Sequence, residues 1–264
     1  MAIEATYKGS SFFELLQQDH PHLLPRFPIE PGADTSKIPH GTTVLAARYR
    51  DGVLVAGDRL ATEGYRVASR DVEKVIATDQ HSLIAIAGAA GPSIEMARVF
   101  SVELEHYEKI EGESLGLEGK ANKLSQMIRQ NLPAAMQGLV VVPLFAGYDT
   151  RRRTGRLWKF DITGGRYEEA NFEANGSGSL YARESMKQDW QEGLDRDGVL
   201  RMAVRALTAA SDEDRATGGI DLERRIFPVI RFSVEEGIEA AAEDQIEAIY
   251  REILQERSAG GTAS

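Results

Sequence analysis

The folded domain begins at Gly41-Thr42-Thr43-Val44-Leu45-Ala46-Ala47, which is followed by Arg50-Asp51-Gly52 and then by Val53-Leu54-Val55-Ala56. Two short apolar runs joined by Asp-Gly predict a β-hairpin, because Asp-Gly readily forms the tight turn between antiparallel strands. Most positions in both runs are apolar, so we expect both faces of their sheet to be covered.

Thr42 has two interpretations. If the chain is cut after Gly41, Thr42 carries a hydroxyl and a free α-amine, and the amine can act as general base for the hydroxyl of the same residue. Thr is also β-branched and simply suits the start of a strand. Taken alone, Gly41-Thr42-Thr43 favours the second interpretation.

Composition removes several classes of function. The 264 residues fit one large domain or two small ones, and the net charge of -10 argues against non-specific binding to nucleic acid or to an anionic membrane. The sequence has no cysteine, which excludes disulfides and thiolate chemistry. The N-terminus does not resemble a secretory signal, and no apolar run is long enough for a membrane span. We expect a cytoplasmic protein.

Histidine is scarce after Thr42. Only His81 and His106 follow it, both in polar or charged stretches. The sequence after Thr42 therefore offers few histidines for a Ser-His-Asp triad or for a histidine-rich metal site. We expect neither a metal nor an organic cofactor.

Residues 1–41 differ from the rest of the chain. They contain five of the nine prolines, and only the segment around Phe12–Leu16 has the apolar spacing of a short helix. A segment of this kind builds no core and is typical of a linker, a tail or a pro-segment. We expect residues 1–41 to be a propeptide, 42–256 the domain, and 257–264 a flexible tail.

Helices and strands are predicted in blocks. Residues 156–161 alternate as a half-buried strand does. The order is strands, two helices, strands, helix, strand, helix, which predicts an α+β fold with mainly antiparallel sheets rather than a doubly wound parallel one. Helices are expected near 97–107, 121–135, 199–210 and 246–254, and strands near 83–87, 139–146, 156–161 and 227–232.

Three residues downstream of Thr42 suggest chemistry. Asp58 ends an apolar strand, where a buried charge requires a partner, and Lys74 can supply it. An ammonium group near an α-amine also lowers the pKa of that amine. The backbone N–H of Gly88 can stabilise a tetrahedral oxyanion. For each residue alone the purely structural interpretation is stronger: Asp58 as a turn residue, Lys74 as a surface lysine and Gly88 as the end of a strand.

Five motifs combine these residues with others. They are Gly57-Asp58-Arg59-Leu60-Ala61-Thr62, Arg70-Asp71-Val72-Glu73-Lys74-Val75, Ala87-Gly88-Ala89-Ala90-Gly91, Gly176-Ser177-Gly178-Ser179 and Asp214-Arg215-Ala216-Thr217-Gly218-Gly219. With Gly41-Thr42-Thr43-Val44, this set resembles proteasome β subunits of the actinobacterial type over roughly residues 40–255. The resemblance implies a four-layer αββα sandwich of N-terminal-nucleophile hydrolases.

The resemblance also implies a role for each matching position. Thr42 is the nucleophile, Lys74 tunes it, Asp58 orients that lysine and Gly88 donates to the oxyanion. Thr62 contacts the backbone of an extended substrate. Leu60 stands where arginine is common in the family, which affects the expected ion pairs near the site. The amine is supported by Ser177, Asp214 and Thr217, and Thr217 stands where serine is frequent in the family. The pocket for the side chain before the scissile bond is lined by Ala61, Val72, Ile86 and Ala90.

The expected activity is peptide-bond hydrolysis inside a compartment, after self-cleavage between Gly41 and Thr42. The resemblance implies heptameric β rings in a stacked four-ring particle, a proteasome α subunit, an ATP-dependent unfoldase ring and substrates carrying a tag such as a small ubiquitin-like modifier. Apolar pocket residues predict cleavage after hydrophobic side chains. Two alternatives stay open: another N-terminal-nucleophile hydrolase, such as a simpler two-ring protease or an amidase, and a ring subunit without catalytic activity.

Overall fold

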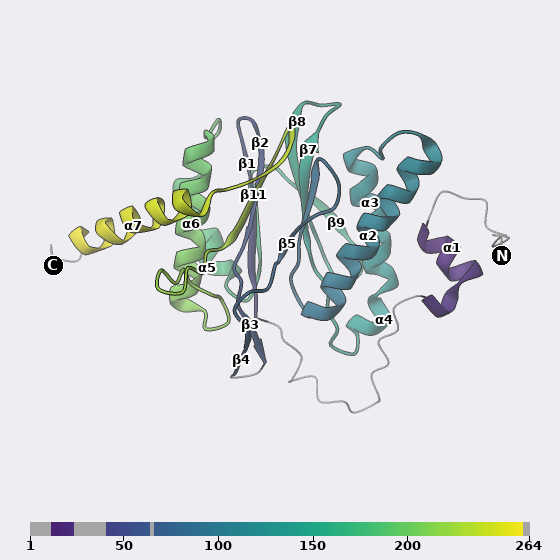
Figure 1. Cartoon of the computed structure of the whole chain (residues 1–264), viewed down its shortest axis with the longest axis horizontal. Coiled ribbons are helices and arrows are strands. Elements are labelled where there is room, and N and C mark those ends of the chain that lie inside the picture. The colour runs from purple at the N-terminus through teal and green to yellow at the C-terminus, as the bar shows by residue number, and fades with distance from the viewer. Residues whose placement is uncertain (1–11, 24–40, 64–65, 261–264) are drawn as a thin grey trace.

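The computed structural model describes residues 12–23, 41–63 and 66–260. Two antiparallel sheets stack face to face, and helices cover the outer face of each (Figure 1). The predicted α+β fold with antiparallel sheets is confirmed.

The predicted hairpin forms the middle of the first sheet. Strands β1 and β2 pair antiparallel, with Val44 opposite Gly57 and Tyr49 opposite Gly52. Successive side chains on β1 point to opposite faces of the sheet. Val44 therefore packs between the two sheets, and Leu45 packs against the helices on the other face. The sheet runs β10-β1-β2-β11-β12, with β1 at Thr43–Tyr49, β2 at Gly52–Gly57, β10 at Phe172–Gly176, β11 at Val229–Val234 and β12 at Gly237–Ala240.

The second sheet corrects two predictions. The strand expected over 139–146 begins only at Leu144, after Pro143, which has no N–H to donate to a ladder. The strand expected to be half buried is buried on both faces, because Leu157 packs between the sheets and Trp158 packs under helices. The sheet runs β5-β6-β7-β8-β9, with β5 at Val75–Ala77, β6 at Ser82–Ala85, β7 at Leu144–Asp149, β8 at Thr154–Phe160 and β9 at Arg166–Glu169, and the separate β3-β4 hairpin spans Ala61–Glu63 and Arg66–Ser69.

Helices form the two outer layers (Figure 1). Helices α2 and α3 bury Phe100 and Leu124 against the second sheet. One helix on the other side escaped the sequence analysis: α5 buries only Ala182 and Met186, too few positions to give a helical pattern. The helices are α2 at Ala90–Glu111, α3 at Leu117–Gln130, α4 at Leu132–Ala135, α5 at Ser179–Asp189, α6 at Arg196–Glu213 and α7 at Glu243–Gly260.

The end of α7 differs from the expectation. The tail was predicted to start at residue 257, but the helix continues to Gly260. Arg257 forms an ion pair of 2.7 Å with Asp212 at the end of α6, which favours the helical conformation there. The remaining predicted tail, residues 261–264, lies outside the described residues.

Part of the predicted propeptide is described. Helix α1 at Phe12–Asp19 lies beside α2, and its Leu16 is buried (Figure 1). A short 3-10 helix at Pro21–Leu23 follows α1. The segment 24–40, which holds the other leader prolines, lies outside the described residues.

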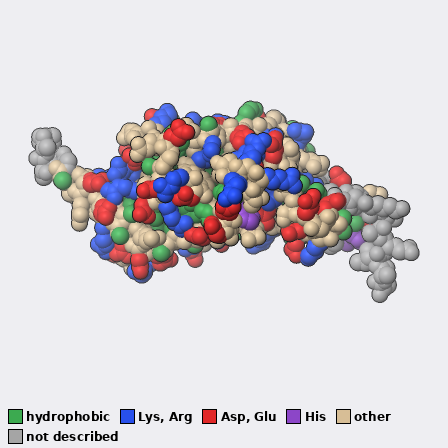
Figure 2. Space-filling view, turned by 90° about the horizontal axis from the view of Figure 1, so that it is seen from above, with side chains coloured by type: hydrophobic (Ala, Val, Ile, Leu, Met, Phe, Trp, Pro, Cys, Tyr) green, Lys and Arg blue, Asp and Glu red, His purple; other side chains and the backbone are tan. Residues whose placement is uncertain are grey.

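Charges of both signs are interspersed over the face seen in Figure 2. Within the described ranges, no helix combines the length and the apolar character needed to cross a membrane.

Candidate active site

Thr42 lies directly before β1 and is buried, with an exposed fraction of 6%. Its carbonyl accepts a hydrogen bond from the backbone N–H of Ser177 at 2.8 Å. This junction requires the glycine that precedes Ser177. Gly176 has φ +100°, and a Cβ there would lie 2.0 Å from the Thr42 carbonyl oxygen. The start of β1 and the end of β10 thereby hold Thr42 in place.

Asp58 and Lys74 form the ion pair expected from the sequence. The Lys74 Nζ lies 2.7 Å from Asp58 Oδ1, and both side chains are almost fully buried. Asp58 also accepts three backbone N–H groups at 2.8 to 2.9 Å, so its buried charge is well satisfied. These donors belong to Thr43, Leu60 and Gly218.

Lys74 uses all three of its ammonium donors. Besides Asp58, they reach the Leu60 carbonyl at 2.6 Å and the Gly41 carbonyl at 3.3 Å. Burial lowers the pKa of Lys74 below its usual value, while Asp58 opposes this decrease. The lysine therefore lies against the peptide bond that joins the leader to Thr42.

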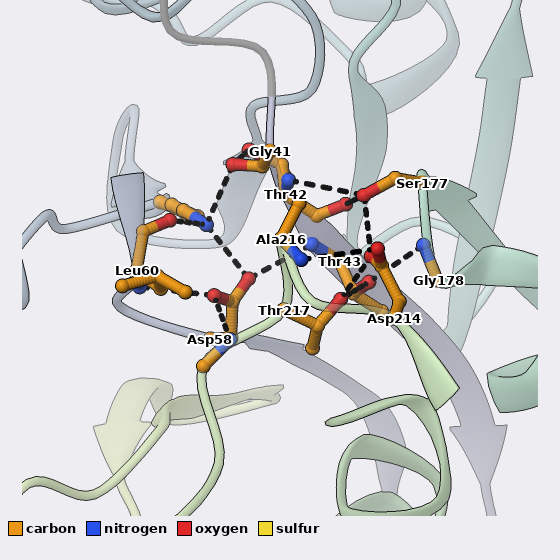
Figure 3. Close-up of polar contacts among 12 residues, drawn as sticks. Gly41, Thr42, Thr43, Asp58, Leu60, Ser177, Gly178, Asp214, Ala216 and Thr217 are labelled. Atoms are coloured by element: carbon orange, nitrogen blue, oxygen red, sulfur yellow. Dashed lines mark hydrogen bonds and ion pairs between the residues drawn. The ribbon is translucent and has the colours of Figure 1, made fainter. Parts of the chain in front are cut away.

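A chain of hydroxyl groups lies on the other side of Thr42 (Figure 3). The Thr42 nitrogen lies 3.5 Å from Ser177 Oγ, and Ser177 Oγ donates to Asp214 Oδ2 at 2.5 Å. Thr217 Oγ1 donates to the same carboxylate oxygen at 2.6 Å. Asp214 thus connects to the Thr42 nitrogen through one serine hydroxyl.

Thr217 has a second partner besides Asp214. Its hydroxyl contacts Thr43 Oγ1 at 2.6 Å (Figure 3). Thr43 in turn donates its N–H to Asp58 and accepts the N–H of Gly178 at 3.1 Å. Thr43 therefore joins the two sides of the site, a role that sequence reasoning missed because Thr43 reads as an ordinary strand residue.

Gly88 lies in a bridge to Val141 rather than in a strand. On either side of Gly88, Val142 N donates to Ala87 O and Ala89 N donates to Val140 O. The N–H of Gly88 itself therefore points away from residues 140–142. Gly88 has φ +104°, and a Cβ would lie 2.1 Å from the Val140 carbonyl oxygen. A residue with a side chain cannot replace glycine here without moving the backbone.

One pocket joins these groups. Gly41, Thr42, Lys74 and Gly88 line it, together with Ala61, Val72, Ile86 and Ala90, which are the pocket residues expected from the sequence. Ala87 and Ser93 complete the lining, and neither was predicted. The structure thus brings the expected nucleophile, lysine and oxyanion donor to one small apolar pocket.

Thr62 and Leu60 lie at the rim of the site. Thr62 approaches Gly41 so closely that a Cβ on Gly41 would meet Thr62 Oγ1 at 2.6 Å. Leu60 buries its side chain and contributes through its backbone alone, to both Asp58 and Lys74. The neighbouring Arg59 pairs with Asp71 at 2.5 Å.

Among the described residues, no cluster of three or more His, Asp or Glu side chains is arranged to hold a metal ion.

Sequence comparisons agree with this geometry. Residues 38–222 match the model of the family described as Proteasome subunit. A proteasome subunit beta of Acidimicrobium ferrooxidans is 51% identical over 247 residues, covering 94% of this chain and 90% of the relative. The chain belongs to the proteasome β subunits. Further relatives carrying that name are those of Acidothermus cellulolyticus, 49% identical over 255 residues (95% and 88% covered), and Streptomyces griseus, 48% identical over 250 residues (94% and 89% covered).

Proteasome β subunits are the catalytic subunits of the bacterial proteasome core, and this chain is accordingly a threonine peptidase that assembles into the core particle. This membership favours the proteasome over the alternatives of a two-ring protease, an amidase or a non-catalytic ring subunit. The remaining question is which residues do which part of the chemistry.

Proposed function

We propose that Thr42 is the nucleophile of this peptidase and that it becomes competent when the Gly41–Thr42 peptide bond is cut. The observation that carries this proposal is the position of Thr42 between the buried Asp58–Lys74 pair and the Ser177–Asp214 chain, in the wall of the pocket. In the uncut chain the Thr42 nitrogen is an amide and cannot act as a base.

The first reaction is cleavage of the chain by its own threonine. Thr42 Oγ attacks the Gly41 carbonyl carbon, the C–N bond breaks, and the Thr42 nitrogen takes up the hydroxyl proton to become an amine. Water then hydrolyses the ester and releases residues 1–41 as a carboxylate. Lys74 Nζ, 3.3 Å from the Gly41 carbonyl oxygen, polarises that carbonyl.

The same groups then act on substrates. The free amine of Thr42 accepts the proton of Thr42 Oγ as this oxygen attacks the scissile carbonyl, and water later hydrolyses the acyl-enzyme. Departure of Gly41 frees one donor of Lys74 beside the new amine, whose pKa its positive charge lowers. Ser177 and Asp214 orient the amine and exchange its proton, and the N–H of Gly88 stabilises the oxyanion.

Substrate selection follows from the pocket. Ala61, Val72, Ile86 and Ala90 accept an apolar side chain before the scissile bond. Thr62, on the edge of the β3-β4 hairpin beside Gly41, pairs with the backbone of an extended substrate.

The wider assembly is part of the proposal. The four layers form a sandwich of the N-terminal-nucleophile hydrolase kind, in heptameric β rings stacked between rings of α subunits in the cytoplasm. An ATP-dependent unfoldase ring feeds tagged proteins into this compartment.

Within the site, Thr217 acts by holding Asp214 and Thr43 through its hydroxyl group.

The N-terminal residue of the assembled protein tests the nucleophile. We expect the intact mass of active particles to correspond to a chain starting at Thr42, and Thr42→Ala to abolish both processing and peptide cleavage while particles still assemble. An electrophilic peptide should label Thr42 covalently. Active particles whose β chain still carries residues before Thr42 would refute the proposal.

A further inference from the structure

Ser93 is a polar side chain in an otherwise apolar part of the pocket. It lines the same pocket as Thr42, Ala90 and Ile86 and is 2% exposed. Ala90 and Ser93 are three residues apart on α2 and so lie on one face of the helix. Ala90 is partly exposed, so Ser93 is the less solvent-accessible of the two.

The hydroxyl of Ser93 has hydrogen-bonding capacity left over. Its bond to the Ala87 carbonyl is long, at 3.4 Å. A serine hydroxyl also has two acceptor lone pairs, and among the described residues no hydrogen-bond donor reaches them. A buried hydroxyl in this state gains most from a partner that brings its own donor.

We propose that Ser93 determines specificity by accepting a hydrogen bond from the far end of the substrate side chain before the scissile bond. The class of side chain that fits is apolar along its length with a donor at its tip, and tyrosine is the simplest example. Ala61, Val72 and Ile86 contact the apolar part, and Ser93 receives the hydroxyl. This inference rests on the proposed function, in which this pocket holds that side chain.

Tyrosine and phenylalanine differ by one hydroxyl, so their comparison isolates this contact. Without a partner, the tyrosine hydroxyl loses its bonds to water on entering the pocket, which disfavours tyrosine. With Ser93 as acceptor, that loss is compensated. The ratio of kcat/KM for cleavage after tyrosine to that after phenylalanine therefore reports on Ser93, and it does not depend on the fraction of active particles.

The test uses assembled particles and matched fluorogenic peptides ending in tyrosine, phenylalanine or leucine. We expect Ser93→Ala to lower the tyrosine-to-phenylalanine ratio by about three- to ten-fold, the range of one hydrogen bond. Ser101→Ala is the matched control, because Ser101 lies on the same helix, donates to Ala97 O at 3.0 Å and does not line the pocket; its ratio should equal that of wild type.

A second measurement needs no variant. In wild-type particles, the peptide with tyrosine should be cleaved about three- to ten-fold more efficiently than one with 4-fluorophenylalanine, which has a tip of similar size but no donor. Three results would overturn the proposal. The first is an unchanged tyrosine-to-phenylalanine ratio in Ser93→Ala, and the second is equal cleavage of the tyrosine and 4-fluorophenylalanine peptides. The third is no cleavage after either aromatic residue by particles that cleave after leucine. Wild-type particles that fail on all peptides, leucine included, refute the proposed function instead.

Discussion

The two sides of Thr42 are built from different chemistry. On one side, Asp58 and Lys74 are 1% and 2% exposed and form an ion pair surrounded by backbone groups. On the other, Ser177 is exposed and Asp214 is only partly buried, and the contacts run through hydroxyl groups. The first side places an ion pair in the interior, whereas the second places one carboxylate and two hydroxyl groups nearer to solvent.

This difference predicts unequal tolerance to change. Removing one member of a buried ion pair leaves the other charged, desolvated and unpaired. Removing one group from a solvated hydroxyl chain lets water take its place. We therefore expect the Asp58–Lys74 side to couple stability and activity, and the Ser177–Asp214 side to affect mainly activity.

The largest effect is expected for Lys74→Ala. It leaves Asp58 buried without its cation, which costs about 3–5 kcal/mol of unfolding free energy, and it removes the group that tunes Thr42, lowering kcat by about 1,000-fold or more. Peptide hydrolysis and the unfolding temperature of assembled particles measure the two effects.

The control is a second ion pair, Lys120 with Asp79, neither of which lines the pocket of Thr42. Lys120 lies 2.5 Å from Asp79 and is 7% exposed in its side chain. Lys120→Ala should lower the unfolding temperature while the particles that remain folded keep their kcat. If Lys120→Ala and Lys74→Ala reduce kcat equally, the lysine of the site has no special part in the chemistry.

Asp214→Asn should have a smaller effect that falls on activity alone. Asparagine keeps an acceptor for the hydroxyls of Ser177 and Thr217 but loses the charge, so kcat should fall by about 100-fold with a change in unfolding free energy under about 1 kcal/mol. Asp212→Asn, close by on α6 and paired with Arg257, should leave kcat unchanged. A large loss of stability in Asp214→Asn would contradict the contrast between the two sides.

The smallest expected effect is a difference in pH dependence. Burial lowers the pKa of Lys74 below its ordinary value of 10.5, so at alkaline pH the folded state binds fewer protons than the unfolded state. The contribution of Lys74 to the unfolding free energy must therefore rise with pH, from its folded pKa up to about 10.5. Unfolding temperatures of wild type and Lys74→Met, compared between pH 8 and 10, should diverge in that direction, and parallel curves would contradict it.

Elements determined by neighbouring residues could be predicted from the sequence, whereas features that depend on contacts distant in the chain could not. The β1-β2 hairpin follows from two apolar runs and Asp-Gly, all within neighbouring residues. Helix α5 was missed because it buries two residues only, and β8 was thought half buried because a strand cannot reveal from its own pattern that a second sheet covers it. The end of α7 was misplaced because Arg257 is stabilised by Asp212, distant in sequence.

The candidate site shows the same division. Asp58, Lys74 and Gly88 could be selected by residue type and position at the ends of strands, helped by the family resemblance. The contacts of Leu60 and Gly218 could not, because they use backbone atoms that every residue carries. Ser93 could not be distinguished from other helical serines until the pocket was seen.

The sequence by itself determined the first β-hairpin, the antiparallel α+β character and the residue types available for chemistry, because these depend on local pattern and composition. Only the tertiary structure decided that Thr217 contacts both Asp214 and Thr43, and that Lys74 lies against the Gly41 carbonyl. Such contacts join segments far apart in the chain, and their distances are set by how the two sheets stack and where β1, β2 and β10 end.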